Sequence, residues 1–299
     1  MRNINSPFWR FLRNAAVTGL GLLVLGTLVR GQAVKPSVTD EPETAPLNRL
    51  FGLREKVSDL HPLLAKLYPV AVAKDKTLRI FTPDEAAKTY VLSKTVPEPF
   101  PIPEGIRAAF PLEALGGGPA CVVTPEVFTQ ADGFVFILHE FVHCGQWATV
   151  EDKLKETLGL YRRAMEKKDY MWELQHPFPY DDARFVAAYG AMFAALRSGD
   201  GAGVRRSRTE LAGLLSADDF DYMTWQEWKE GLARHIENAV RARVGLPPNN
   251  GGLERPYTRV TFYAGGDRLI GFLAQADTQV PADLERTFAA LRSIQVPRP

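Results

Sequence analysis

The chain has 299 residues, of which 45% are hydrophobic and 24% charged, so it can build a substantial core and is not a disordered chain. Its 36 basic and 35 acidic residues give a formal net charge of +1, and no long block of one sign occurs. A nucleic-acid partner is therefore not expected.

The N-terminus has a pattern typical of export. Arg2, Arg10 and Arg13 precede an uncharged run, AAVTGLGLLVLGTLV, at residues 15–29. This run is long for the core of a signal peptide and short for a spanning helix of roughly 17–25 residues. We therefore predict residues 1–30 to be either a cleaved signal peptide or a membrane-anchoring transmembrane helix. The remaining chain is then secreted, or tethered on the periplasmic or extracellular side.

The residues after this segment predict a linker and then one folded domain. Residues 31–48 are rich in proline and predict an extended linker, so the domain is expected to cover 49–299. It begins with a helix around 52–67. VAVAKDKTLRIF at 70–81 then predicts a hairpin, because two β-rich ends flank a polar turn.

The stretch after the hairpin mixes turn and strand signals. Thr82 before Pro83-Asp84-Glu85 predicts the start of a short helix. Residues 97–119, rich in proline and glycine, predict a long loop, whereas ACVVT at 120–124 predicts a strand. One hypothesis is that an extended peptide pairs with the edge of this strand.

The second half is predicted to be helical, because apolar residues recur at spacings of three and four. The expected helices are 131–149, 151–168, 182–197, 203–215, 223–244 and 281–293. Residues 257–275 are ambiguous, since Gly265-Gly266 either turns a hairpin or lets a helix pack closely, and we favour the helix. A small N-terminal sheet followed by a mostly helical half defines an α+β domain.

The segment HEFVH at 139–143 predicts a metal site. His139 and His143 are four residues apart, so on a helix they lie on one face and can bind one ion. Glu140 lies beside that ion, close enough to take a proton from a metal-bound water. Zn²⁺ fits two imidazoles and one carboxylate with a fourth position open. The alternative is an amphipathic helix with two surface histidines.

The downstream segment WQEWKEGLARHIEN at 225–238 resembles the helix that supplies the third ligand in gluzincin metallopeptidases. The resemblance implies that Glu230 binds the metal, with Glu227 as the second choice, and that Glu237 is a supporting or ion-pairing residue. The separation of the two segments is longer than in aminopeptidase-N-like and thermolysin-like enzymes. It is closer to the looser peptidase-MA-like group, which implies a zincin-like fold.

A second similarity lies at Tyr263-Ala264-Gly265-Gly266, which resembles the Y-x-x-G element of aminopeptidase-N-like members. It implies that the Tyr263 hydroxyl steadies the oxyanion, with Tyr257 as the rival. The resemblance as a whole implies a zinc peptidase acting on peptide or protein substrates. The alternatives are a zinc hydrolase of another amide, or a non-catalytic binding or structural domain.

The chain contains two cysteines, Cys121 and Cys144, which leave a further alternative open. An oxidising compartment would permit them to form a disulfide. Two buried thiols would fit the sequence equally well.

Overall fold

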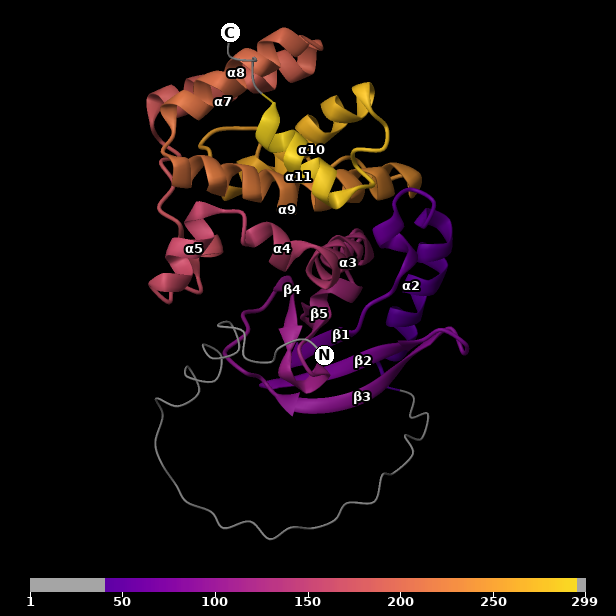
Figure 1. Ribbon diagram of the computed structural model, residues 1–299. Coiled ribbons are helices and arrows are strands. Elements are labelled where there is room, and N and C mark those ends of the chain that lie inside the picture. The colour runs from indigo at the N-terminus through magenta and orange to yellow at the C-terminus, as the bar shows by residue number, and fades with distance from the viewer. Residues whose placement is uncertain (1–40, 295–299) are drawn as a thin grey trace. The chain divides into compact units, whose positions relative to one another are not determined.

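The structure, a computed structural model, describes residues 41–294 (Figure 1). Contacts divide this part of the chain into two compact units. The first unit comprises 41–55 and 66–134, and the second comprises 56–65 and 135–294. The α+β class is confirmed, since a five-stranded sheet precedes a mostly helical half.

The first unit is built on a mixed sheet with the strand order β3-β2-β1-β5-β4. The strands are β1 Val70–Lys74, β2 Thr77–Asp84, β3 Thr89–Pro97, β4 Arg107–Leu112 and β5 Gly118–Val123. The predicted hairpin is confirmed, because β1 and β2 pair antiparallel across a turn at Asp75 and Lys76. Both turn residues have positive φ, as a two-residue turn that follows the twist of its strands requires.

Two predictions between 82 and 119 are wrong. The short helix at Pro83 does not form, since β2 continues to Asp84, whose side chain accepts hydrogen bonds from the next turn at the backbone nitrogens of Ala86 and Ala87. The predicted loop 97–119 contains β4 and a short 3-10 helix, η2 Glu113–Leu115. β4 forms because it pairs antiparallel with β5, a tertiary partner that local composition does not reveal.

The strand predicted at 120–124 is confirmed as β5, but the hypothesis that a peptide adds to its edge is wrong. β5 pairs in parallel with β1 on one side and antiparallel with β4 on the other. Its backbone groups are therefore already hydrogen-bonded on both edges.

Helix α2, Thr44–Val57, belongs mostly to the first unit and starts inside the predicted linker. Its early residues are ordered by burial, because Leu47 and Leu50 are fully buried. The Asn48 side chain also accepts a 2.7 Å hydrogen bond from the backbone nitrogen of Tyr90 in β3. One core of the sheet consists of Ala71, Ala73, Leu78, Ile80, Leu112, Ala120 and Val122.

The prediction of a membrane-anchoring transmembrane helix is corrected. Within residues 41–294, no helix is both long enough and apolar enough to cross a membrane. The longest of them, α9, has 27 residues but carries charged side chains along its length. The segment 1–30 and most of the linker 31–48 lie outside the described residues, and export stays a prediction.

The second unit consists of helices. They are η1 Pro62–Ala65, α3 Gly133–Thr149, α4 Glu151–Lys155, α5 Gly159–Glu166, α6 Trp172–Gln175, α7 Ala183–Ser198, α8 Gly201–Leu214, α9 Ala217–Arg243, α10 Arg259–Ala276 and α11 Leu284–Ser293, with α3 beginning at the end of the first unit. The helix predicted at 151–168 is interrupted between α4 and α5. α9 starts earlier than predicted, because the Ser216 side chain caps it by accepting from the Asp219 nitrogen.

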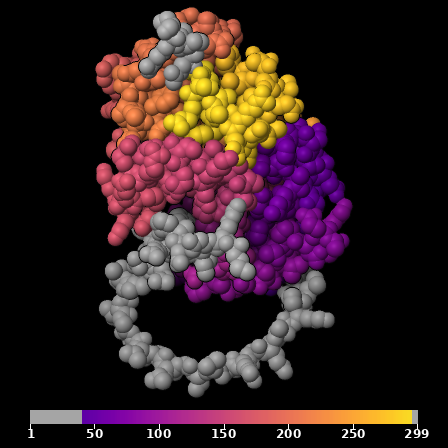
Figure 2. Space-filling view, in the orientation of Figure 1, coloured from indigo at the N-terminus to yellow at the C-terminus, as the bar shows by residue number. Residues whose placement is uncertain are grey.

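Helices α9 and α10 pack backbone against backbone at a glycine contact, which confirms the helical reading of 257–275. A Cβ added to Gly231 would lie 2.4 Å from the Gly266 Cα, and one added to Gly266 would lie 2.0 Å from the Glu227 carbonyl oxygen. Only glycine permits this approach. On the face shown in Figure 2, the orange and yellow parts of the second unit touch. The contact sets Glu230 of α9 beside the first turns of α10.

Cys121 lies on β5 in the first unit, and Cys144 lies on α3 in the second unit. Both are present as buried thiols. The structure therefore agrees with the second of the two alternatives for the cysteines.

Candidate metal centre

The structure brings His139, His143 and Glu230 together in the second unit. One ligand atom from each side chain lies within 4.8 Å of the others. The Oε2 atom of Glu230 is 3.2 Å from Nε2 of His143 and 3.8 Å from Nε2 of His139. Within the described residues, this is the one group of histidine, cysteine and acidic side chains close enough to hold a metal ion.

The two histidines converge because α3 is a buried helix. Phe141 and Val142 are fully buried between them, so the helix cannot rotate its histidine face toward solvent without exposing apolar surface. The imidazoles of His139 and His143 are themselves only 6–8% exposed, and their ring centroids lie 5.0 Å apart. The reading of HEFVH as two surface histidines is therefore wrong.

Glu237, two turns after Glu230 on α9, orients His139. Its Oε2 atom lies 2.9 Å from Nδ1 of His139, and its other oxygen accepts hydrogen bonds from Arg241 at 2.7 Å and Asn249 at 2.9 Å. This arrangement directs Nε2 of His139 toward Glu230. A carboxylate on the outer nitrogen of a ligating histidine fixes its tautomer and makes it a stronger ligand.

Gln146 orients His143 in a similar way, a contact that the sequence analysis did not predict. Its Oε1 atom lies 2.8 Å from Nδ1 of His143, while its amide nitrogen donates to the Lys229 carbonyl oxygen at 3.2 Å. Gln146 lies three residues after His143 on α3, a spacing that puts the two side chains on one face. That spacing is the signal that could have identified it.

The electrostatics of the centre favour a cation. Burial alone would raise the pKa of Glu230, but the neighbouring imidazoles of His143 and His139 and the charge of Arg259 hold it well below its usual range. Burial alone would lower the pKa of His139, but the neighbouring carboxylates of Glu230 and Glu237 raise it to about 10. Both pKa shifts favour a positive charge between the two carboxylates, and a metal ion held here would supply one.

Glu140 lies beside this group on α3 and is 7% exposed. Burial raises the pKa of its carboxyl group, and the neighbouring His143 and His139 oppose that rise. Within residues 41–294, no side chain or backbone group donates a hydrogen bond to it. The group is therefore available to exchange a proton with a bound molecule.

Helix α10 contributes Tyr263 and Arg259 to the other side of Glu230. Burial and the charge of the Glu230 carboxylate hold the pKa of Tyr263 well above its usual range. Nη1 of Arg259 lies 3.3 Å from Oε1 of Glu230. The two oxygens of Glu230 thus have different partners, since Oε2 faces the imidazoles and Oε1 faces Arg259.

The rival residues lie elsewhere in the second unit. Glu227 is fully buried and accepts hydrogen bonds from Arg208 and from the Tyr189 hydroxyl, each at 2.8 Å, so it is not part of the metal-binding group. Tyr257 packs against the rings of Tyr189 and Phe185. The sequence weighed both as alternatives, and neither reaches the centre.

The remaining histidines have structural partners. His61 contacts the Pro281 carbonyl oxygen at 2.8 Å, His176 contacts Asp219 at 2.8 Å, and His235 contacts Asp267 at 3.0 Å. None of the three belongs to the metal-binding group found in residues 41–294.

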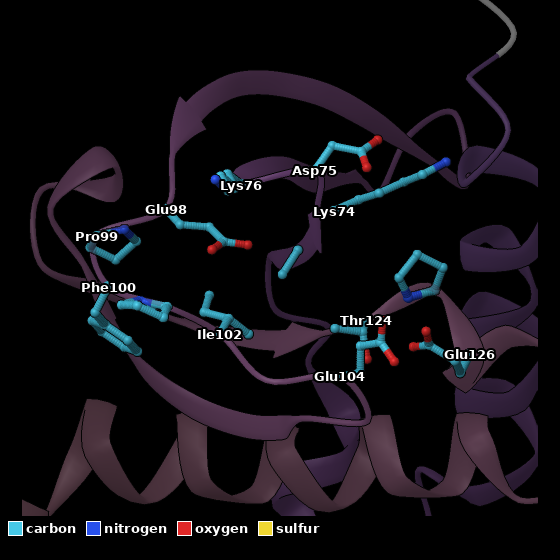
Figure 3. A pocket seen from close by; sticks show the side chains of 13 residues that line it. Lys74, Asp75, Lys76, Glu98, Pro99, Phe100, Ile102, Glu104, Thr124 and Glu126 are labelled. Atoms are coloured by element: carbon cyan, nitrogen blue, oxygen red, sulfur yellow. The ribbon is translucent and has the colours of Figure 1, made fainter.

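A groove in the first unit is chemically different from this centre. Figure 3 shows it between the β1–β2 turn and the segments around residues 98–104 and 124–126. Its lining mixes lysine and acidic side chains with proline and other apolar residues, and contains no histidine or cysteine. It includes no residue of the metal-binding group.

No protein-family model, no curated protein and no solved structure matches this chain. The class of protein therefore rests on the site itself. Two imidazoles and a carboxylate form a buried group that can hold a metal ion, on an α+β fold.

Proposed function

We propose that this protein is a zinc-dependent metallopeptidase that hydrolyses peptide bonds. The observation that carries the proposal is the meeting of His139 and His143 from α3 with Glu230 from α9, with Glu140 beside them. The resemblance of these two segments to those of gluzincin peptidases supports the same assignment.

The donor set fits zinc. Ligand atoms bound about 2.0–2.2 Å from a tetrahedral zinc ion lie about 3.3–3.6 Å apart. The two distances from Glu230 Oε2 to the imidazole nitrogens, 3.2 and 3.8 Å, bracket that range. Two nitrogens and one carboxylate oxygen leave a fourth position, as in catalytic rather than structural zinc sites. Bound there, zinc supplies a Lewis acid that polarises a carbonyl group and lowers the pKa of water.

Glu140 serves as the general base in this proposal. Its carboxylate takes a proton from the attacking water and then donates it to the amine that leaves when the peptide bond breaks. The pKa of Glu140 is raised by burial, which brings it nearer to the pH at which such an exchange is efficient.

Tyr263 donates a hydrogen bond to the oxyanion that develops on the scissile carbonyl. It remains a neutral donor because its pKa lies well above its usual range. The charge of Glu230 acts on this hydroxyl in the structure, and during the reaction the hydroxyl turns to the substrate oxygen instead. In this proposal, Glu140 transfers the proton and Tyr263 binds the oxyanion, and both side chains belong to the second unit.

Metal analysis followed by one substitution tests the proposal. The purified chain is expected to retain about one zinc ion, and Glu140→Gln is expected to keep the zinc while losing roughly 10²–10⁴-fold in peptide hydrolysis. Hydrolysis is measured on a mixed peptide library by mass spectrometry. Absence of stoichiometric zinc would instead support the non-catalytic domain, and full activity of Glu140→Gln would refute its role as the base.

A further inference from the structure

Arg259, the first residue of α10, places a guanidinium beside the metal centre with donors to spare. Nη1 lies 3.3 Å from Glu230 Oε1 and 3.5 Å from Gln226 Oε1. Charge-assisted hydrogen bonds are usually roughly 2.7–2.9 Å long, so both contacts are weak. Within residues 41–294, no other side chain or carbonyl accepts a hydrogen bond from this guanidinium.

The other cations near the centre are engaged more fully. Lys229 lies 2.6 Å from Glu173 and 3.3 Å from Glu151. Arg234 donates to the carbonyl oxygens of Asn249 and Gly251 at 3.2 Å each. Both cations therefore hold parts of the scaffold together.

Arg259 is also positioned to receive a ligand. The side chain is 32% exposed, whereas that of Glu230 is 12% exposed. Its guanidinium carbon lies 5.3 Å from the centre of the Tyr263 ring, and such stacking orients the group while its edge remains free. A planar guanidinium held in this way matches the two oxygens of a carboxylate.

The surface next to Arg259 suits a peptide. Val260 follows Arg259 and is 39% exposed, and Leu174 is 58% exposed. These are the large hydrophobic side chains that the described residues leave exposed. Gln226 links their neighbourhoods, since it donates to the Glu173 carbonyl oxygen at 3.1 Å and accepts from Arg259.

Metal binding would increase the positive charge around Arg259. A divalent ion carries more positive charge than the single negative charge of Glu230 compensates. The Glu230 oxygen that Arg259 contacts would then attract the guanidinium less strongly. The positive charge around Arg259 that Glu230 does not compensate would attract an anionic group of the substrate.

We propose that Arg259 is a specificity-determining residue that binds a carboxylate of the peptide substrate. The inference rests on the peptidase function proposed above. The carboxylate is either the free C-terminus or an acidic side chain, and both present the same two oxygens. Arg259 therefore selects peptides that carry such a group near the bond to be cut.

The test measures binding, so it does not require turnover. The full chain carrying Glu140→Gln is loaded with zinc and titrated calorimetrically with three forms of one peptide mixture. They end in a free carboxylate, in an amide, or in an amide with one aspartate added. We expect one of the two carboxylate-bearing forms to bind roughly 10- to 100-fold more tightly than the plain amide.

Substitutions then test whether Arg259 causes the preference for carboxylate-bearing peptides. Arg259→Gln is expected to remove it, and Arg259→Lys to keep part of it, because lysine retains the charge without the planar fork. Arg268→Gln is the matched control, since Arg268 lies on the same helix and donates to Asn250 at the exposed surface. It is expected to leave the preference unchanged.

Three results would overturn the inference. They are equal affinity for the three peptide forms, a preference that survives Arg259→Gln, and loss of zinc from that variant. The last would show that Arg259 acts on Glu230 rather than on substrate. The peptidase proposal fails separately if the zinc-loaded, unsubstituted chain cleaves no peptide. The binding comparison can still be measured in that case.

Discussion

The carboxylate of Glu237 lies 2.9 Å from Nδ1 of His139, although 98 positions separate them in the chain. The contact joins α3 to α9 and leaves Nε2 of His139 facing Glu230. One helix thus supplies both a candidate ligand, Glu230, and the residue that orients another ligand. The geometry of the centre therefore depends on how α9 is held as much as on the HEFVH segment.

Glu237→Gln is predicted to weaken zinc binding roughly 10- to 100-fold, because the amide keeps the shape but loses the charge that strengthens His139 as a ligand. The zinc dissociation constant, measured by competition with a chelator, checks this. Glu210→Gln, on the exposed face of α8, is the matched control and should bind zinc like the unmodified chain. An unchanged dissociation constant for Glu237→Gln would show that the contact is merely structural.

The pH dependence of stability is predicted to change with metal loading. The pKa of His139 is raised to about 10 in the metal-free centre, against an ordinary value of 6.5. The stabilisation from its proton is therefore fully present below about pH 6.5 and is lost as the pH rises through about 10. The lowered pKa of Glu230 acts at acidic pH and adds no slope in this window.

Melting temperatures between pH 7 and 10 measure this effect. The chelator-treated chain should lose stability as the pH rises, and the zinc-loaded chain should lose less, because the ion replaces the proton. His139→Gln should also flatten the slope of the metal-free chain. A metal-free chain with the same slope as His139→Gln would contradict the assignment of the proton to His139.

Gly266→Ala is predicted to destabilise the fold by about 1–3 kcal/mol, because its Cβ would lie 2.0 Å from the Glu227 carbonyl oxygen and force α10 away from α9. Thermal or denaturant unfolding measures the loss. Gly271→Ala on the same helix is the control. The nearest atom to its Cβ would be 3.8 Å away, so the helix should gain up to about 1 kcal/mol. Equal effects of the two substitutions would rule out the glycine contact as the cause.

Glu227→Gln separates the buried ion pair from the metal centre. It leaves the charge of Arg208, which is fully buried, without its carboxylate partner, so we expect a loss of about 3–5 kcal/mol of stability. Zinc affinity should change little, because Glu227 is not in the metal-binding group. Calorimetric unfolding checks the predicted loss of stability, and zinc titration checks the predicted zinc affinity. A large loss of zinc affinity in a folded variant would make Glu227 a ligand candidate again.

The parts of the centre that depend on helical spacing were predictable from the sequence. His139 and His143 were predicted from their four-residue spacing on a helix, with Glu140 between them. The resemblance of the second segment favoured Glu230 over Glu227. The contribution of Gln146 was not predicted, although its spacing from His143 was visible.

The missed features depend on contacts between distant segments. β4 is a strand because it pairs with β5, and Arg259 reaches Glu230 because glycines let α10 approach α9. Neither relationship leaves a periodic signal in its own segment. Side-chain polarity likewise predicted Asp84 as part of a helix start, whereas the structure uses it to close a turn.

A zinc anomalous-difference map from crystals of the zinc-loaded chain tests the central claim most directly. We predict one peak about 2.0–2.2 Å from Nε2 of His139, Nε2 of His143 and a carboxylate oxygen of Glu230. A peak bound by other residues, or no peak near these three side chains, would contradict the claim.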